Sequence, residues 1–323
     1  MKKKLRIVFN TWTGAMFQKG GGEVQLLQTK AALERMGHEV LLFDQWNPQM
    51  DVDIAHQFST EQGTEHFVFK YKQYGVPVAI STIMWTPPPK HDYQFHRIRQ
   101  LLDVSDVLFP NSEMEAKNLS AYFEVDAAKW LKSRNSISVA YSSRGTADLF
   151  RSKFNIKEPF ILSVANIDRR KNTKLLSRAC AELGQQLVTI GHVKDPGYFE
   201  EFKDSYPGHV HLGPIEDEHM LKSAYAACDV YALPSLCETP GIAALEAASQ
   251  GAKIVITSEG CAEEYFGKEA IYVDYRSIES ICKGLSEGIA ATKNPELPAK
   301  VVSEYSWDVT AEEIVTGYRR LFN

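Results

Sequence analysis

The sequence predicts an α/β protein built from two doubly wound, Rossmann-like domains that face a cleft. At 323 residues, the chain exceeds the length at which a single hydrophobic core stops growing. Apolar runs of strand length alternate with helical stretches in both halves, a pattern typical of parallel sheets. We place the domain boundary near residue 150, giving domains 1–150 and 151–305, and expect residues 306–323 to form a closing helix.

The first half shows the strand–helix alternation from its first residues. A glycine-rich turn follows the first apolar run, and residues 23–36 are expected to form a helix that Gly37 caps. The later apolar runs each lead into a polar or proline-containing loop. The expected strands are residues 5–9, 39–43, 51–58, 77–82 and 106–111.

The second half repeats this order, beginning with a strand in the apolar run that precedes Asn166. The closing helix is expected to start at an N-cap residue, either Ser306 or Asp308. The expected strands are residues 159–165, 186–191, 209–213, 229–234, 253–257 and 270–274, and the expected helices are residues 172–183, 219–228 and 241–249.

Composition and charge exclude several classes of protein. Apolar residues make up 44% and charged residues 24% of the chain, as in a folded globular protein. The net charge is −5 and the basic residues are scattered, so we expect no nucleic-acid partner. No apolar run is long enough for a signal peptide or a membrane span. We therefore expect a soluble protein, and leave peripheral contact with a membrane open.

The five cysteines are odd in number and show no C-x-x-C spacing. Free thiols in a reducing cytoplasm fit this pattern, which favours a cytoplasmic location.

The strongest local signal is the run SLCETPGIAALEAASQGAKIVIT, which contains Glu238 and Glu246. We expect Thr239 to be an N-cap, Pro240 to take the first helical position, and Gly241 to let a ligand approach the backbone. Unpaired amides at the start of the helix would face a phosphate.

Glu246 would lie two turns into a strongly apolar helix, where a buried carboxylate needs a partner. The vicinal hydroxyls of a ribose would supply one. The alternative is structural: Glu238 would then be a loop charge, and Glu246 a solvated or paired helix residue.

A second signal is the basic cluster in SVANIDRRKNTKLL. Arg169, Arg170 and Lys171 follow a strand directly, at the edge of a parallel sheet where ligands commonly bind. Arg170 and Lys171 could hold a diphosphate, because a guanidinium offers a planar fork and an ammonium a point charge. The alternative is a solvated basic surface.

Three weaker features complete the predicted site. The glycine run Gly20–Gly22 after the first strand permits a tight turn that exposes amides to an anion, although it lacks the G-x-G-x-x-G spacing. Ile215 and Gly213 could contact a nucleobase. The aromatic, proline-rich loop around Trp85 and His91 is the candidate acceptor contact, with structural packing as the alternative.

Taken together, GGGEVQLLQTKAALERMGHEVLLF, SVANIDRRKN, VYALPSLCETPGIAALEAASQGAKIVIT and YSWDVTAEEIVTGYRRLF resemble the retaining glycosyltransferase family 4, which has the GT-B fold. The resemblance covers nearly the whole chain. Its most specific piece is the glutamate pair with the intervening TPG and the following LEA.

The resemblance implies a role for each part of the predicted site. Glu238 and the amides of Gly241 and Ile242 would contact the donor sugar, Glu246 the ribose, and the basic cluster the diphosphate. Amides at Gly21 and Gly22 would line the cleft from the other domain, to which the closing helix would return.

This sequence departs from the family pattern at two places. Asn166 stands where many relatives have an arginine, which assigns part of the phosphate contact to Arg170 beside Lys171. Ile83 or Met84 occupies the position where many relatives have a histidine, so the usual acceptor-side histidine is missing.

The resemblance and the residues together predict a hexosyltransferase-type enzyme that moves a sugar from a nucleotide-diphosphate sugar to an acceptor hydroxyl with retention, in glycan or glycoconjugate biosynthesis. We expect no metal and no cofactor. The alternatives are a sugar-nucleotide epimerase on the same scaffold and a non-catalytic, glycosyltransferase-like subunit. The donor base, the donor sugar, the acceptor and the oligomeric state are not predicted.

Overall fold

The computed structural model describes residues 4–17 and 19–322, and these residues divide into two compact units. The first unit consists of residues up to Ser136 together with the segment from Tyr305 onward, and the second spans Ile137–Glu304. The division falls before the predicted boundary near residue 150. The reason is local: Gln250 donates to the carbonyl of Tyr141 (3.2 Å) and accepts from the amide of Gly145 (2.8 Å), which holds this connecting segment on the second unit.

The first unit contains a parallel five-stranded sheet in the order β2-β1-β3-β4-β5. Its strands are β1 (Arg6–Asn10), β2 (Glu39–Leu42), β3 (Ile54–Phe58), β4 (Val78–Ser81) and β5 (Val107–Phe109). Its helices are α1 (Gly21–Arg35), α2 (Glu65–Gln73), α3 (Tyr93–Val104), α4 (Glu113–Phe123) and α13 (Trp307–Arg320), with 3-10 turns at η1 (Ala15–Phe17) and η2 (Ala127–Lys129).

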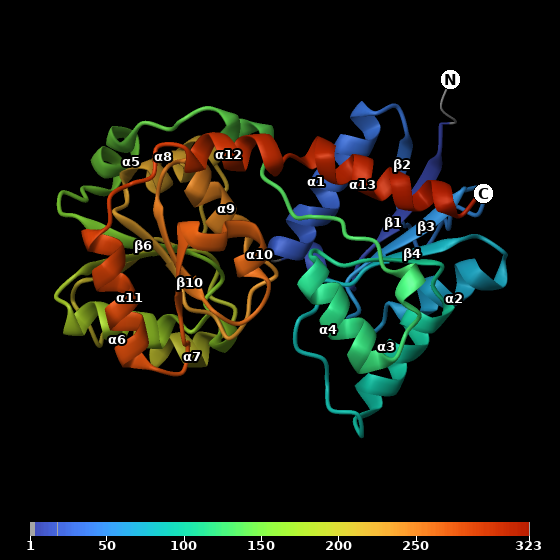
Figure 1. Ribbon diagram of the computed structural model, residues 1–323, viewed down its shortest axis with the longest axis horizontal. Helices are drawn as coiled ribbons and strands as arrows, with labels where there is room; N and C mark the ends of the chain where they lie inside the picture. Colours follow the sequence, from blue (N-terminus) through green and yellow to red (C-terminus); the bar gives the residue numbers. More distant parts are fainter. Residues whose placement is uncertain (1–3, 18, 323) are drawn as a thin grey trace. The chain divides into compact units, whose positions relative to one another are not determined.

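Helices cover both faces of this sheet. Apolar side chains of α2, α3 and α4 share one buried core with strand residues such as Leu108. Consecutive strand residues point to opposite faces, and the next residue, Phe109, packs edge-on against Tyr318 of α13. Figure 1 shows α13 lying beside α1 across this face. The N-cap of α13 is Ser306, one of the two predicted residues.

The second unit contains a parallel six-stranded sheet in the order β11-β10-β9-β6-β7-β8. Its strands are β6 (Phe160–Val164), β7 (Gln186–Ile190), β8 (His209–His211), β9 (Val230–Leu233), β10 (Lys253–Thr257) and β11 (Ala270–Val273). Its helices are α5 (Ala147–Phe154), α6 (Thr173–Glu182), α7 (Pro196–Glu200), α8 (Glu218–Ala227), α9 (Ile242–Ser249), α10 (Ala262–Phe266), α11 (Ile278–Ala290) and α12 (Leu297–Glu304), with 3-10 turns at η3 (Val139–Ser142), η4 (Arg169–Lys171) and η5 (Gly267–Glu269).

The core of the second unit also lies on both faces of its sheet. Leu176 and Cys180 of α6 and Ile281 and Leu285 of α11 pack on one face (Figure 1). On the other face, Tyr225 of α8 lies against Tyr231 of β9. The predicted α/β class with two parallel, Rossmann-like sheets is therefore confirmed.

Several helices were not predicted, among them α2, α3 and α4. In α3 the buried residues Phe95, Ile98, Leu101 and Leu102 follow helical spacing, and Asp92 accepts a hydrogen bond from the amide of Gln94 at the N-cap. Among the helices of residues 4–17 and 19–322, none combines the length and the apolar character needed to cross a membrane.

Candidate functional site

The topology of the second sheet brings the two strongest sequence signals together. Strands β6 and β9 are neighbours, although the chain runs from β6 to β7 and β8 before it returns to β9. Such a reversal of strand order leaves a crevice at the carboxyl ends of the two strands, where ligands bind in open α/β sheets. The loop after β6 carries the basic cluster and the loop after β9 carries Glu238.

Lys171 and Glu238 form an ion pair at this edge of the sheet. The Lys171 Nζ lies 2.5 Å from Glu238 Oε1, and the side chains are only 13% and 4% exposed. Asp168 accepts a hydrogen bond from the amide of Lys171 at 2.9 Å, which fixes the η4 turn. A charge pair shielded from water in this way depends on both partners, because losing one leaves a buried, uncompensated charge.

The three cations of the basic cluster have different surroundings. Arg169 pairs with Asp195 and with Glu201 Oε1, the latter at 2.5 Å, and so joins η4 to the residues that flank α7 on either side. The Arg170 side chain is exposed, while its carbonyl accepts the Leu236 amide at 2.8 Å. The structure thus brings Lys171 and Glu238 together, and the roles predicted for Arg170 and for the pair stay predictions.

Asn172 connects three loops at the same edge, and the sequence did not single it out. Its backbone is left-handed (φ 56°), and its side-chain amide donates to the carbonyls of Pro234 (3.1 Å) and Tyr275 (2.9 Å). The loops that follow β6, β9 and β11 are therefore held together by one residue.

Two details of the predicted helix start are wrong. Thr239 is not the N-cap and Pro240 does not take the first helical position, because α9 begins at Ile242 with Gly241 as its N-cap. The Thr239–Pro240 peptide is cis, and Gly241 has φ +88°, outside the helical region. Gly241 does bring the backbone close to the glutamate: a Cβ at Gly241 would lie 3.1 Å from Glu238 Oε2.

Glu238 is also fixed from the loop after β10. Its amide donates to the Glu259 carbonyl (3.1 Å), and its carbonyl accepts the Cys261 amide (3.0 Å). Gly260, between those residues, has φ +112°, and a Cβ there would lie 2.0 Å from the Glu238 carbonyl oxygen. Only glycine fits this approach, a constraint that sequence reasoning missed because it joins residues distant in the chain.

Glu246 lies on α9 and is held by tyrosines rather than by a cation. The Tyr225 hydroxyl donates to Glu246 Oε2 at 2.9 Å, and the Tyr141 hydroxyl also interacts with this carboxylate. Burial raises the pKa of Glu246 to about 7, and the hydrogen bond from Tyr225 acts in the opposite direction. The residue as a whole keeps partial exposure.

The remaining predicted residue of this unit is Ile215. It lies half-buried in the loop between β8 and α8, and the carbonyl of nearby Gly213 accepts the Gly191 amide at 3.0 Å. Its contact with a nucleobase stays a prediction.

In the first unit, the glycine run begins a helix instead of forming an open loop. Gly20 is the N-cap, and Gly21 and Gly22 are the first residues of α1. The Glu23 carboxylate accepts the Gly20 amide (2.7 Å) and the Trp12 indole N–H (3.1 Å). The donor contacts predicted for Gly21 and Gly22 stay predictions.

The two predicted acceptor contacts lie in the segment between β4 and α3. Trp85 is half-buried, its carbonyl accepts the Asn118 side chain at 2.6 Å, and His91 is exposed in the same loop. The segment ends where α3 begins at Tyr93. The acceptor role of Trp85 and His91 stays a prediction.

His56 belongs to the run of residues 51–58 that was expected to form a strand, and it is a core residue of the first unit. It lies within β3, is fully buried, and binds the Tyr318 hydroxyl (2.5 Å) and the Ser81 hydroxyl (2.9 Å) through its two ring nitrogens. Burial lowers its pKa to about 3. It therefore joins α13 to the sheet as a neutral core residue.

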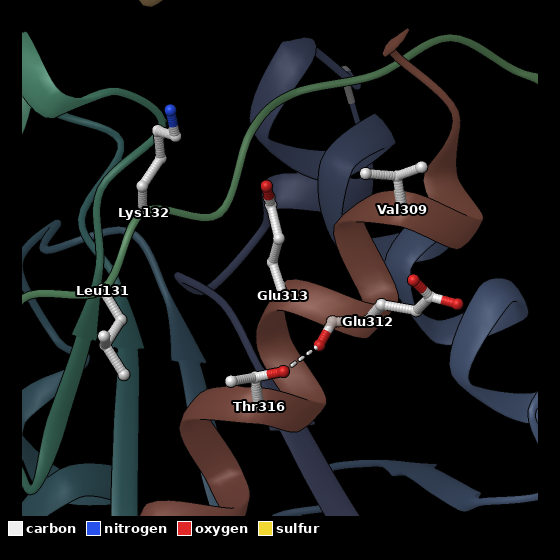
Figure 2. A pocket seen from close by; sticks show the side chains of 6 residues that line it. All are labelled: Leu131, Lys132, Val309, Glu312, Glu313 and Thr316. Carbon is white, nitrogen blue, oxygen red and sulfur yellow. Dashed lines mark hydrogen bonds between the residues drawn. The ribbon is translucent and has the colours of Figure 1, made fainter. Parts of the chain in front are cut away.

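The first unit also has a pocket of about 310 Å³ beside α13, which the sequence did not predict (Figure 2). It is lined by Leu131, Lys132, Val309, Glu312, Glu313 and Thr316. The Glu313 carboxylate forms an ion pair with Arg134, whose Nε lies 2.7 Å from Glu313 Oε1. No predicted site residue lines this pocket.

The second unit, which carries Lys171 and Glu238, matches a known protein family model. Residues 146–302, almost the whole second unit, match the family model described as glycosyl transferases group 1. The chain is 23% identical over 242 residues to a D-inositol 3-phosphate glycosyltransferase of Segniliparus rotundus, covering 68% of this chain and 53% of that protein. It is 24% identical over 238 residues to the serotype-specific mannosyltransferase WbdA of Escherichia coli, covering 67% and 29%.

Solved structures share the fold over nearly the whole chain. Sucrose-phosphate synthase from Thermosynechococcus elongatus superposes with a TM-score of 0.80 at 17% identity, covering 98% of this chain and 99% of that one. HepE of Anabaena in complex with UDP-glucose gives a TM-score of 0.79 at 15% identity, covering 98% and 100%. The protein therefore has the GT-B fold of these glycosyltransferases. The chain spans about half the length of the first two curated relatives it matches, 53% and 54%.

Proposed function

We propose that this protein is a glycosyltransferase that binds a nucleotide-diphosphate sugar at the carboxyl ends of β6 and β9 and moves the sugar to an acceptor hydroxyl. The observation that carries the proposal is the shielded pair Lys171–Glu238, which lies where the strand order reverses and beside the glycine-started helix α9. The match of the second unit to group 1 glycosyl transferases and the UDP-glucose bound by HepE support it.

The chemistry follows from charge. As the bond between the anomeric carbon and the diphosphate oxygen breaks, the sugar ring becomes positive and the leaving diphosphate negative. Groups that are already oriented toward the diphosphate stabilise this charge without reorganising. We assign this role to Lys171, to Arg170 and to the amides of Gly241 and Ile242.

Glu238 has two tasks in this proposal. It holds the Lys171 ammonium in place at 2.5 Å, and its second oxygen, beside Gly241, accepts hydroxyls of the donor sugar. Glu246 accepts the ribose hydroxyls of the nucleotide. A diphosphate arriving near Lys171 would share the ammonium with Glu238, which is the reason to expect sensitivity to either residue.

We further propose retention of the anomeric configuration without a metal. The acceptor oxygen forms the new bond to the anomeric carbon on the face that the diphosphate leaves, and the acceptor proton passes to a diphosphate oxygen. Among the described residues, no group of three or more His, Cys, Asp or Glu side chains is arranged to hold a metal ion. In a metal-free reaction, the diphosphate charge falls to Lys171, Arg170 and the amides.

The proposal is tested by a thermal-shift screen across uridine, guanosine and adenosine diphosphate sugars, followed by product analysis with and without a candidate acceptor hydroxyl and with EDTA. A ligand that binds only the folded state must raise the melting temperature. We expect one base to raise it, and transfer to persist in EDTA with the anomeric proton of the product retaining its configuration.

Two other activities give different results in the same assay. An epimerase would convert the nucleotide sugar without an acceptor, and a non-catalytic subunit would leave every nucleotide sugar unchanged. Absence of any nucleotide-dependent shift would contradict the proposal itself.

A further inference from the structure

Three buried tyrosines form a connected row beneath the two glutamates of the second unit. Tyr141, Tyr225 and Tyr231 are at most 2% exposed. Ring centroids are 6.1 Å apart between the first two and 5.9 Å apart between the second and third. A buried tyrosine hydroxyl needs a hydrogen-bond partner. Two of the three hydroxyls have a carboxylate as partner, and the third has a backbone carbonyl.

Two of these hydroxyls act on the same carboxylate. Tyr225 donates to Glu246 Oε2 at 2.9 Å, and Tyr141 also interacts with Glu246. The third, Tyr231, donates to the carbonyl of Val164 at 3.2 Å. The row therefore contains its own control: a tyrosine with the same burial and ring packing whose hydroxyl has a backbone partner instead.

The two Glu246 contacts come from separate elements. Tyr225 belongs to α8, which packs against α9, and Tyr141 belongs to η3 on the segment that begins the second unit. The same segment is held by Gln250, which follows α9 directly. The carboxylate is thus oriented from two directions by groups that donate hydrogen bonds and carry no positive charge.

We propose that Tyr225 and Tyr141 are positioning residues that orient the Glu246 carboxylate as the acceptor for the two vicinal hydroxyls of a ribose. This inference rests on the proposed function for the identity of the ligand. Glu246 would then discriminate between ribose and 2′-deoxyribose, and that discrimination would depend on a residue that touches no ligand.

The surroundings of Glu246 also make ligand affinity depend on pH. Its pKa is raised by burial and by the charge of Glu218 on α8, and lowered by the hydrogen bonds from Tyr225 and Tyr141. Burial raises the pKa of Tyr231 on β9, and the charges of Glu238 and Glu246 act in the same direction. An ionised carboxylate accepts two hydroxyls, whereas a protonated one has lost part of this capacity. Affinity for a ribonucleotide should therefore rise with pH through the titration of Glu246.

The test compares Tyr225→Phe with Tyr231→Phe, which changes the same ring in the same row without removing a Glu246 contact. Calorimetry measures the affinity of each variant for a ribonucleoside diphosphate, for its 2′-deoxy analogue and for inorganic pyrophosphate. Tyr225→Phe should weaken ribonucleotide binding by about fivefold, the effect of one lost hydrogen bond, and lower the ratio of ribonucleotide to deoxynucleotide affinity. Pyrophosphate affinity should stay unchanged, as should all three affinities in Tyr231→Phe.

A second readout does not require any ligand. In a carbon-13 NMR titration of the glutamate carboxyls, Tyr225→Phe should raise the pKa of Glu246, because the hydrogen bond that favours the ionised form is lost. Tyr141→Phe should act in the same direction, and Tyr231→Phe should leave the titration unchanged. Circular dichroism and the melting temperature establish that each variant folds.

The outcomes separate this inference from the proposed function. If the wild-type protein binds no nucleoside diphosphate, the proposed function fails and so does the ribose assignment, while a raised Glu246 pKa in Tyr225→Phe would still support the positioning role. If the wild-type protein binds and Tyr225→Phe matches Tyr231→Phe in both readouts, the positioning role is overturned and the proposed function stands.

Discussion

A glutamate on the helix that follows a strand has different surroundings in the two units. In the first unit, Glu115 of α4 is fully buried and accepts the hydroxyl of Thr82 and the amides of Met84 (3.0 Å) and Asn111 (2.8 Å). In the second unit, Glu246 is partly exposed and its recorded contacts come from tyrosine hydroxyls. A carboxylate with donors from three residues inside the protein is expected to support the fold, whereas the proposal gives the carboxylate held by tyrosine hydroxyls a role in binding a ligand.

His56 of the first unit and the pair Lys171–Glu238 of the second unit also differ in charge and exposure. His56 of the first unit is enclosed by Tyr318 and Ser81 and is kept neutral. Lys171 and Glu238 of the second unit form a charged pair that keeps some exposure on the lysine side. We therefore expect changes near the edge of the first sheet to act on stability, and changes near the edge of the second to act on binding and turnover.

The largest expected effect on stability comes from acid titration of His56. Its folded pKa of about 3 lies below the unfolded value of 6.5. The unfolded state therefore binds more protons as the pH falls, and the stability from His56 is present above pH 6.5 and lost between pH 6.5 and 3. Between pH 7 and pH 4.5, urea unfolding should show the wild type losing about 2.5 kcal/mol more stability than His56→Gln. In His56→Gln this part of the pH dependence should disappear, whereas His91→Asn at an exposed site should keep it.

For the second unit the largest effect is expected on turnover. Lys171→Ala should lower kcat by about 10²-fold or more, as for other groups that stabilise transition-state charge. Lys174→Ala is the matched control, because Lys174 is exposed and pairs with Glu201 away from Glu238. Steady-state kinetics compare the two variants, and wild-type turnover in Lys171→Ala would refute the assignment.

Glu115→Gln should lower stability without an effect on nucleotide binding. The substitution replaces a charged acceptor of three hydrogen bonds by an amide with one acceptor oxygen, at a cost of about 2 kcal/mol. Denaturant unfolding measures the change. A variant as stable as wild type would show that this carboxylate does not support the fold.

Glu246→Gln should weaken nucleotide binding without a loss of stability, and the change in binding should be smaller than the change in turnover expected for Lys171→Ala. Its neutral side chain avoids the desolvation of a carboxylate, so the melting temperature should stay close to wild type or rise. Affinity for a ribonucleoside diphosphate should fall about tenfold, as expected when a charged acceptor becomes neutral. Equal losses of stability in Glu246→Gln and Glu115→Gln would break the distinction between the two regions.

The sequence alone predicted the fold better than the site. Strands such as β6 and β10 are short buried apolar runs, and their pattern is visible without any structure. The helix start near Gly241 was predicted two residues too early, since the peptide before Pro240 is cis and Gly241 takes a positive φ. A single sequence does not distinguish a cis proline followed by a glycine with positive φ from a proline at the first position of a helix.

Contacts between distant residues account for the other misses. Gly260 is fixed by its approach to Glu238, and Tyr225 and Tyr141 by their approach to Glu246, yet none of the three stands out in its local sequence. The sequence assigned Lys171 and Glu238 to one ligand site, but their direct pairing depends on the strand order, which the sequence did not predict. The exposure of Arg170 could not be, since it depends on how the η4 turn is oriented.

The central claim is that the edge between β6 and β9 holds a nucleoside diphosphate. Calorimetric titration of the wild-type protein and of Lys171→Ala, with Lys174→Ala as control, with uridine, guanosine and adenosine diphosphate tests it most directly. We predict that one of the three nucleotides binds the wild type and Lys174→Ala with equal affinity and binds Lys171→Ala at least tenfold more weakly. Failure of all three nucleotides to bind the wild type, or equal binding by Lys171→Ala, would contradict it.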